Sequence, residues 1–170
     1  YKIKLISESS IVDNKIYCIT GPKLVNFKNS LANVNGVLNA IKIETDQLNS
    51  LFLEGEGAGG KATASSVLSD LFEIHSNPKI KSLGYNFNKL KKLEKLNILD
   101  LESSYYLRIM AKDIAGVLSK ITGYFKDFDI SIKKIMQIPD TDEKNTLVPI
   151  IIITHSIKKI KLNKVIDMIE

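Results

Sequence analysis

Three glycines are the first residues whose types and spacing suggest chemistry. Gly55, Gly57 and Gly60 lie in GEGAGGKATASSV and satisfy the G-x-G-x-x-G spacing of a dinucleotide-binding turn. A predicted strand precedes them and apolar residues at helical spacing follow them. The fingerprint also needs a second parallel strand and an acidic residue about 20 residues later. A lysine-rich run follows instead, so this loop is not the first turn of a complete dinucleotide-binding domain.

The segment Asp113-Ile114-Ala115-Gly116-Val117 is the second candidate site. It lies between a predicted strand and a predicted helix that Gly116 opens, and the free N–H groups of such a helix can hold a carboxylate. The Asp113 side chain can accept a hydrogen bond from an ammonium group. These residues predict a site for a free amino acid. The structural alternative is that Asp113 caps the helix and Gly116 allows close packing.

Metal ligands and catalytic groups are not recognisable in the sequence. The two histidines, His75 and His155, lie far apart and form no metal-ligand spacing with the single cysteine, Cys18. One cysteine excludes an internal disulfide framework and fits a reducing, cytoplasmic compartment. Because Cys18 lies in an apolar stretch, we expect it in the core.

Composition and charge are ordinary for a globular protein. The formal net charge is +5, and six lysines fall within residues 79–95, which favours either nucleic-acid binding or a solvated connector. Aromatic residues are scarce there, so we predict a connector and no nucleic-acid partner. We also predict no membrane partner, because no apolar run approaches the roughly 18 residues of a membrane span. The chain begins within an apparent strand and without Met, so a fragment is expected.

The chain is predicted to have an α+β fold in three parts. Residues 1–75 read as a β-rich region, with a break at Gly21-Pro22 and a returning helix at about 61–75. Residues 76–103 read as a linker with a short helix around 90–96. Residues 104–170 read as strand–helix–strand–strand–helix, with residues 147–153 as a central strand and a turn at Asp140–Asp142. A ferredoxin-like βαββαβ unit would need one more strand after Glu170.

Residues 31–75 resemble the C-terminal part of the homoserine dehydrogenase catalytic region. The family pattern runs P-L-A-x-V-x-G-V-x-N-A and then G-x-G-A-G-x-x-P-T-A-S-A-V-x-x-D. Ala62 departs from the usual Pro, which removes a preset helix start but no side-chain chemistry. The matching positions are Leu31, Ala32, Val34, Gly36, Val37, Asn39, Ala40, Gly55, Gly57, Ala58, Gly59, Thr63, Ala64, Ser65, Val67 and Asp70.

Residues 105–137 resemble an ACT domain, a small regulatory module that is often fused to this enzyme. Ala115 replaces the usual Pro before the glycine. The order of the two segments is that of ACT-bearing homoserine dehydrogenases. The matching positions are Tyr106, Leu107, Asp113, Gly116, Val117, Leu118, Ile121, Phe125, Ile130, Ser131, Ile132 and Gln137.

The resemblance implies a reaction, a cofactor and partners. The parent reaction is hydride transfer between NAD(P)H and aspartate semialdehyde, which gives homoserine. The resemblance places Gly59, and after it Gly57, beside NADP or NAD that an N-terminal domain mostly holds. It implies a homodimer formed through the sheet of residues 1–55 and also through the ACT units. It further implies an amino-acid effector, with threonine favoured, at Asp113, Gly116 and Val117. No segment matches the family's catalytic Lys and Asp, so no catalytic residue is assigned.

Two other functions are compatible with part of the sequence. A stand-alone, non-catalytic amino-acid sensor would use only the ACT segment, and the glycine segment discriminates against it because a free sensor has no need for those residues. The regulatory region of aspartate kinase also carries ACT modules, but that hypothesis leaves residues 31–75 unexplained. The sequence therefore favours part of a homoserine dehydrogenase with an ACT domain.

Overall fold

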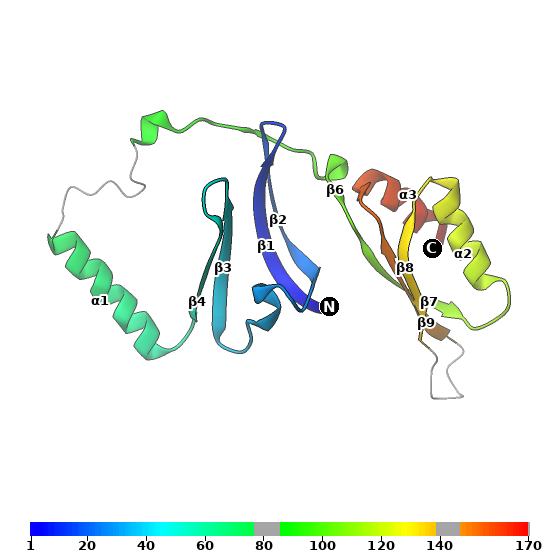
Figure 1. Ribbon diagram of the computed structural model, residues 1–170, viewed down its shortest axis with the longest axis horizontal. Coiled ribbons are helices and arrows are strands. Elements are labelled where there is room, and N and C mark those ends of the chain that lie inside the picture. Colours follow the sequence, from blue (N-terminus) through cyan, green and yellow to red (C-terminus); the bar gives the residue numbers. More distant parts are fainter. Residues whose placement is uncertain (77–85, 139–146, 170) are drawn as a thin grey trace. The chain divides into compact units, whose positions relative to one another are not determined.

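The computed structural model describes residues 1–76, 86–138 and 147–169, and Figure 1 shows its helices and strands. The elements form an α+β fold, as predicted. The chain divides into two compact units. The first contains Tyr1–Glu8 and Ile19–Lys92, and the second contains Ser9–Cys18 and Leu93–Glu170. The predicted turn at Asp140–Asp142 lies outside the described residues.

The chain opens with two long neighbouring strands, β1 (Lys2–Val12) and β2 (Lys15–Val25). Asp13 and Asn14 turn the chain between them with φ of 49° and 59°, the left-handed pair that a tight hairpin turn needs. The predicted break at Gly21-Pro22 is wrong, because β2 runs through both residues. The third strand of this sheet pairs only with Lys15 and Ile16, so Pro22 lies on an edge, where its missing N–H is tolerated.

A second hairpin and a helix complete the N-terminal elements. After the short 3₁₀ helix η1 (Ser30–Asn33), β3 (Leu38–Thr45) pairs antiparallel with β4 (Asn49–Glu56). The predicted turn at Asn35-Gly36 is confirmed: Gly36 has φ of 63°, and the Leu38 N–H donates to the Asn35 carbonyl at 3.2 Å. Helix α1 (Gly60–Ser76) follows, in agreement with the helix predicted at 61–75.

The C-terminal elements follow the predicted order of strand, helix, strand, strand and helix. They are β7 (Tyr106–Lys112), α2 (Val117–Asp127), β8 (Ile132–Gln137), β9 (Leu147–Thr154) and α3 (Lys159–Ile169). The strand order is β7-β9-β8, so β9 is central, as its apolar run predicts. Pro149 limits pairing on one side only: β9 pairs with β7 from Leu147, but with β8 only from Ile150.

The core lies between this sheet and its two helices. Along β9, Val148, Ile150, Ile152 and Thr154 are buried while their neighbours are less so, which is the period of two expected when one sheet face is covered. The covering side chains come from both helices. The core cluster consists of Ile121, Phe125, Ile130, Ile150, Ile152, Ile157, Leu162 and Val165.

The connection between the two regions is not helical where a helix was predicted. Residues 90–96 contain no helix; β5 (Glu94–Lys95) pairs parallel with β2, after the 3₁₀ helix η2 (Phe87–Lys89). Then come the 3₁₀ helix η3 (Ile98–Asp100) and β6 (Glu102–Ser103), which pairs with β10 (Ile157–Lys158). The Asn97 side chain accepts from the Leu99 N–H and fixes the start of η3, so local capping and strand pairing take the place of the predicted helix.

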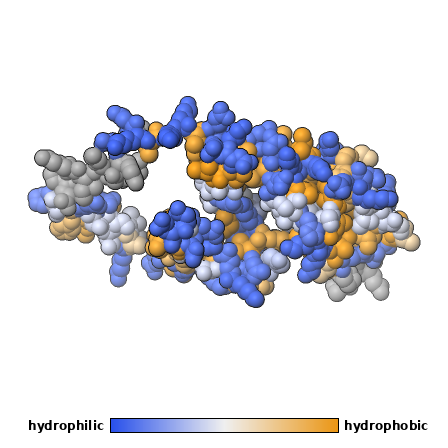
Figure 2. Space-filling model, turned by 45° about the horizontal axis from the view of Figure 1, so that its top comes forward, coloured by the Kyte–Doolittle hydropathy of each residue, from blue (hydrophilic) through white to orange (hydrophobic). Residues whose placement is uncertain are grey.

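Cys18 is exposed, so its predicted core position is wrong. Its Sγ lies 3.2 Å from the Ser9 Oγ. The apolar stretch around Cys18 does form part of strand β2, but within the described residues the face that carries Cys18 is not covered. Exposed hydrophobic side chains are visible as orange surface in Figure 2. None of the helices in the described ranges has the length and apolar character needed to cross a membrane.

Candidate functional site

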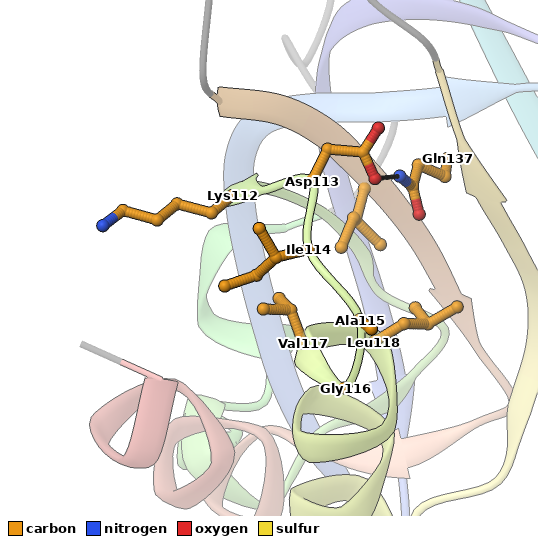
Figure 3. Close-up of a pocket in the computed structure, with 9 residues that line it drawn as sticks. Lys112, Asp113, Ile114, Ala115, Gly116, Val117, Leu118 and Gln137 are labelled. Carbon is orange, nitrogen blue, oxygen red and sulfur yellow. Dashed lines mark hydrogen bonds between the residues drawn. The ribbon is translucent and has the colours of Figure 1, made fainter.

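The turn between β7 and α2 forms a pocket with a volume of about 230 Å³. Figure 3 shows its lining in close-up. The pocket combines one carboxylate, one amide, exposed backbone at a helix start and several apolar side chains. It is lined by Lys112, Asp113, Ile114, Ala115, Gly116, Val117, Leu118, Gln137 and Ile150. All three residues predicted to bind an effector, Asp113, Gly116 and Val117, therefore lie together in one pocket.

Gly116 is the N-cap of α2, with φ of 93° and ψ of −19°. Its carbonyl accepts from the Lys120 N–H at 2.9 Å, which is the first i to i+4 bond of the helix. A Cβ on Gly116 would meet none of the described atoms within 4 Å, so close packing does not explain the glycine. The left-handed backbone does, because residues with a Cβ rarely adopt it. Gly116 and the first two residues of α2, Val117 and Leu118, line the pocket.

Asp113 does not cap the helix. Its Oδ1 accepts a hydrogen bond of 2.7 Å from the Nε2 of Gln137, at the end of β8, and Figure 3 shows the two side chains directed toward each other. The capping alternative is therefore wrong. The hydrogen bond holds the carboxylate in the pocket while the second oxygen, Oδ2, can still accept from a ligand.

The pocket presents groups that are complementary to both charged groups of an amino acid. The N–H groups of Leu118 and Ser119 precede the first intrahelical bond of α2, and such groups favour a bound carboxylate. An ammonium group would find its acceptor at Asp113. The apolar side chains of Ile114 and Leu118, 63% and 39% exposed, can contact a small side chain of the ligand.

Sequence reasoning missed the role of Gln137. This residue was matched to the ACT pattern but was not assigned to the site. The register of β8 on β9 places Gln137 opposite Ile150, on the face that the helices cover, and so beside the turn. Lys112 also lines the pocket and was not assigned to it from the sequence. Figure 3 shows its side chain directed away from the Asp113–Gln137 pair. Assigning the side chains of β8 to the two faces of the sheet would have identified Gln137 as a pocket residue.

The glycine loop lies in the other unit, between β4 and α1. Gly59 has φ of 122°, and its carbonyl accepts from the Thr63 N–H at the start of α1. A Cβ on Gly59 would meet no described atom within 4 Å, so the backbone there is open to a ligand. Such a glycine at a helix start fits the approach of an anionic group.

Gly57 differs from Gly59. Its N–H donates to the Val37 carbonyl at 3.0 Å, and a Cβ would lie 1.5 Å from the Nδ2 of Asn39. Close packing against β3 therefore accounts for Gly57 without a ligand. Of the two glycines predicted to contact the cofactor, Gly59 has the geometry that leaves its backbone accessible.

A metal centre finds no support in the part of the chain that the structure describes. No group of three or more His, Cys, Asp or Glu side chains there could hold a metal ion. The polar groups that the described residues offer at the two candidate sites are backbone, carboxylate and amide groups.

Comparison with known proteins matches both regions of the chain. Residues 1–72 match the family model for homoserine dehydrogenase, and residues 105–167 match the model for the ACT domain. The homoserine dehydrogenase of Pseudomonas aeruginosa is 34% identical over all of this chain and 40% of its own length. That of Lactococcus lactis is 31% identical over all of this chain and 39% of its own length.

Solved structures give the same result. A homoserine dehydrogenase from Thiobacillus denitrificans superposes with a TM-score of 0.83 at 30% identity, over all of this chain and 39% of that one. The S. aureus homoserine dehydrogenase, at 21% identity and a TM-score of 0.60, supports the fold alone. The chain spans about 40% of the length of the relatives that it matches. Residues 1–72 therefore belong to the homoserine dehydrogenase family, and residues 105–167 are an ACT domain.

Proposed function

We propose that this chain is part of an NAD(P)-dependent homoserine dehydrogenase whose ACT domain senses an amino acid. The full enzyme would interconvert aspartate semialdehyde and homoserine, in the cytoplasmic biosynthesis of threonine, methionine and isoleucine. The observation that carries this proposal is the presence of both family segments in one chain. The homoserine dehydrogenase of Pseudomonas aeruginosa aligns with this chain over its whole length. A stand-alone sensor would account for the second segment only.

The cofactor contact proposed for this chain is the backbone at Gly59. When bound, NADP or NAD would supply the hydride chemistry. The chain's contribution is an open backbone at the start of α1, where the N–H groups of the first turn can face a phosphate. Gly57 would support that loop by packing against Asn39. Its N–H already donates to the Val37 carbonyl, so it would not donate to the cofactor.

The chain is expected to form a homodimer, in part through the β3–β4 sheet. On one face, Ile41 lies opposite Leu53 and Ile43 opposite Leu51, and all four side chains are between 40% and 62% exposed. An uncovered apolar face of this kind favours association. Light scattering at tens of micromolar should give twice the mass of the chain, and Ile41→Lys should lower that mass.

Ile74→Lys is the matched control, because Ile74 is similarly exposed but lies on α1. It should leave the mass unchanged. A wild-type monomer at this concentration contradicts the dimer, and equal effects of both substitutions contradict the assigned surface.

The ACT domain is expected to bind threonine in the pocket at the start of α2. Isothermal titration with millimolar threonine, isoleucine and methionine should give binding heat, with threonine the tightest of the three. Asp113→Ala should weaken binding by roughly 10–150-fold, because a hydrogen bond to a charged group contributes about 1.5–3 kcal/mol.

Asp167→Ala controls for the loss of a negative charge, because Asp167 is an exposed residue of α3 that does not line the pocket. Its binding constant should equal that of the wild type. The absence of heat with all three amino acids, from a folded protein, overturns the proposed effector site.

A further inference from the structure

Residues 94–103 are attached at both ends to other parts of the second unit. At the first end, β5 pairs parallel with β2 at Lys15 and Ile16, and the Leu96 N–H donates to the Ile16 carbonyl at 2.8 Å. The accompanying ion pair between Lys15 and Glu94 is long, at 3.9 Å, and exposed, so it adds little. The attachment to the hairpin tip is therefore made mainly by the backbone.

The second end is attached to the core of the ACT domain. Glu102 and Ser103 of β6 pair antiparallel with β10, and the Leu101 carbonyl accepts from the Lys159 N–H at 3.3 Å. Ile157 of β10 is 9% exposed and belongs to the core cluster. Because β10 leads directly into α3, this end should follow any displacement of that helix.

The segment between the two attachments is short and internally bonded. The Asn97 carbonyl accepts from the Asp100 N–H at 2.9 Å, and the Ile98 carbonyl accepts from the Leu101 N–H at 3.2 Å. The resulting η3 turn packs against α3. Because the turn is held by these bonds, little slack is available between the hairpin tip and the ACT core.

We propose that residues 94–103 form a strap that transmits displacements of the ACT domain to the β1–β2 hairpin. The route begins at the pocket, where α2 starts, and continues through the packing of α2 on α3 to the strap. At the other end of the strap, β5 pairs with β2, and the residues of β2 from Ile19 onward belong to the first unit. The strap therefore joins the sensing domain to a strand shared by both units.

The first test lengthens the strap without touching either attachment. Inserting Gly-Ser-Gly between Leu99 and Asp100 interrupts the η3 turn and leaves the sequence of both attachments, residues 94–96 and 101–103, unchanged. In the full chain, hydrogen exchange at the Leu96 amide should become about tenfold faster or more, because an untethered two-residue pairing opens readily. Exchange within β9 should stay unchanged.

The matched control is the same insertion between Lys91 and Lys92, which precede the strap. It should leave the Leu96 amide at the wild-type rate. If the insertion in η3 also leaves this rate unchanged, or if both insertions raise it equally, the strap proposal is overturned.

The second test perturbs the ACT end and measures at the hairpin end. Ile157→Val removes one buried methylene from β10 and should accelerate exchange at Leu96 by roughly two- to tenfold. In the chain with the η3 insertion, the same substitution should have no further effect on Leu96. Equal acceleration in both backgrounds, or none in either, contradicts transmission through the strap, and neither test depends on effector binding.

Discussion

The purified 170-residue chain is expected to show no homoserine dehydrogenase activity. No segment of the sequence matches the family's catalytic Lys and Asp, and the glycine loop does not begin a complete dinucleotide-binding domain. General acid–base catalysis contributes about 10²–10⁴-fold to a rate, and positioning of cofactor and substrate contributes more. Consumption of NADPH with aspartate semialdehyde should therefore equal the background without protein.

The homoserine dehydrogenase of Pseudomonas aeruginosa, assayed under the same conditions, is a suitable positive control. Binding of threonine by the same preparation of the chain would show that its ACT domain is folded during the assay. A turnover number of about 1 per second or more, within the usual range of enzymes, contradicts the prediction. It would mean that the chain contains proton-transfer groups that the family pattern does not reveal.

The fold of the ACT region could be predicted because its local patterns agree with its packing. The near-continuous apolar run of residues 147–153 is typical of a central strand, and β9 occupies that position. The connection could not be predicted in the same way. A short helix was predicted around residues 90–96, but backbone pairing of Glu94 and Lys95 with β2 depends on residues about 80 positions earlier in the chain.

The candidate site was predicted in part. The turn at Asp113–Val117 was found because a glycine between a strand and a helix has a local signature. Gln137 was not assigned, since its place beside Asp113 depends on the register of β8 against β9. Cys18 shows the same limit: an apolar stretch indicates a strand, but not whether another element covers the face on which a given side chain lies.

Phe125→Ala is expected to be the most destabilising single substitution considered. Phe125, on α2, is 1% exposed and belongs to the core cluster with Ile150, Ile152 and Val165. Truncating a buried Phe to Ala typically costs about 3–5 kcal/mol, through lost burial and the cavity that remains. Domains are stable by only about 5–15 kcal/mol, so most of the stability of the ACT domain should be lost.

Urea unfolding followed by circular dichroism should show this loss as an early transition of the ACT domain. Phe72→Ala is the matched control: Phe72 is 69% exposed on α1, and its truncation should change the free energy of unfolding by less than about 0.5 kcal/mol. Because Phe125 lies on the helix that Gly116 opens, the same substitution should weaken the effector pocket, which needs a fixed α2. A Phe125→Ala chain as stable as the wild type would contradict the packing of α2 on this core.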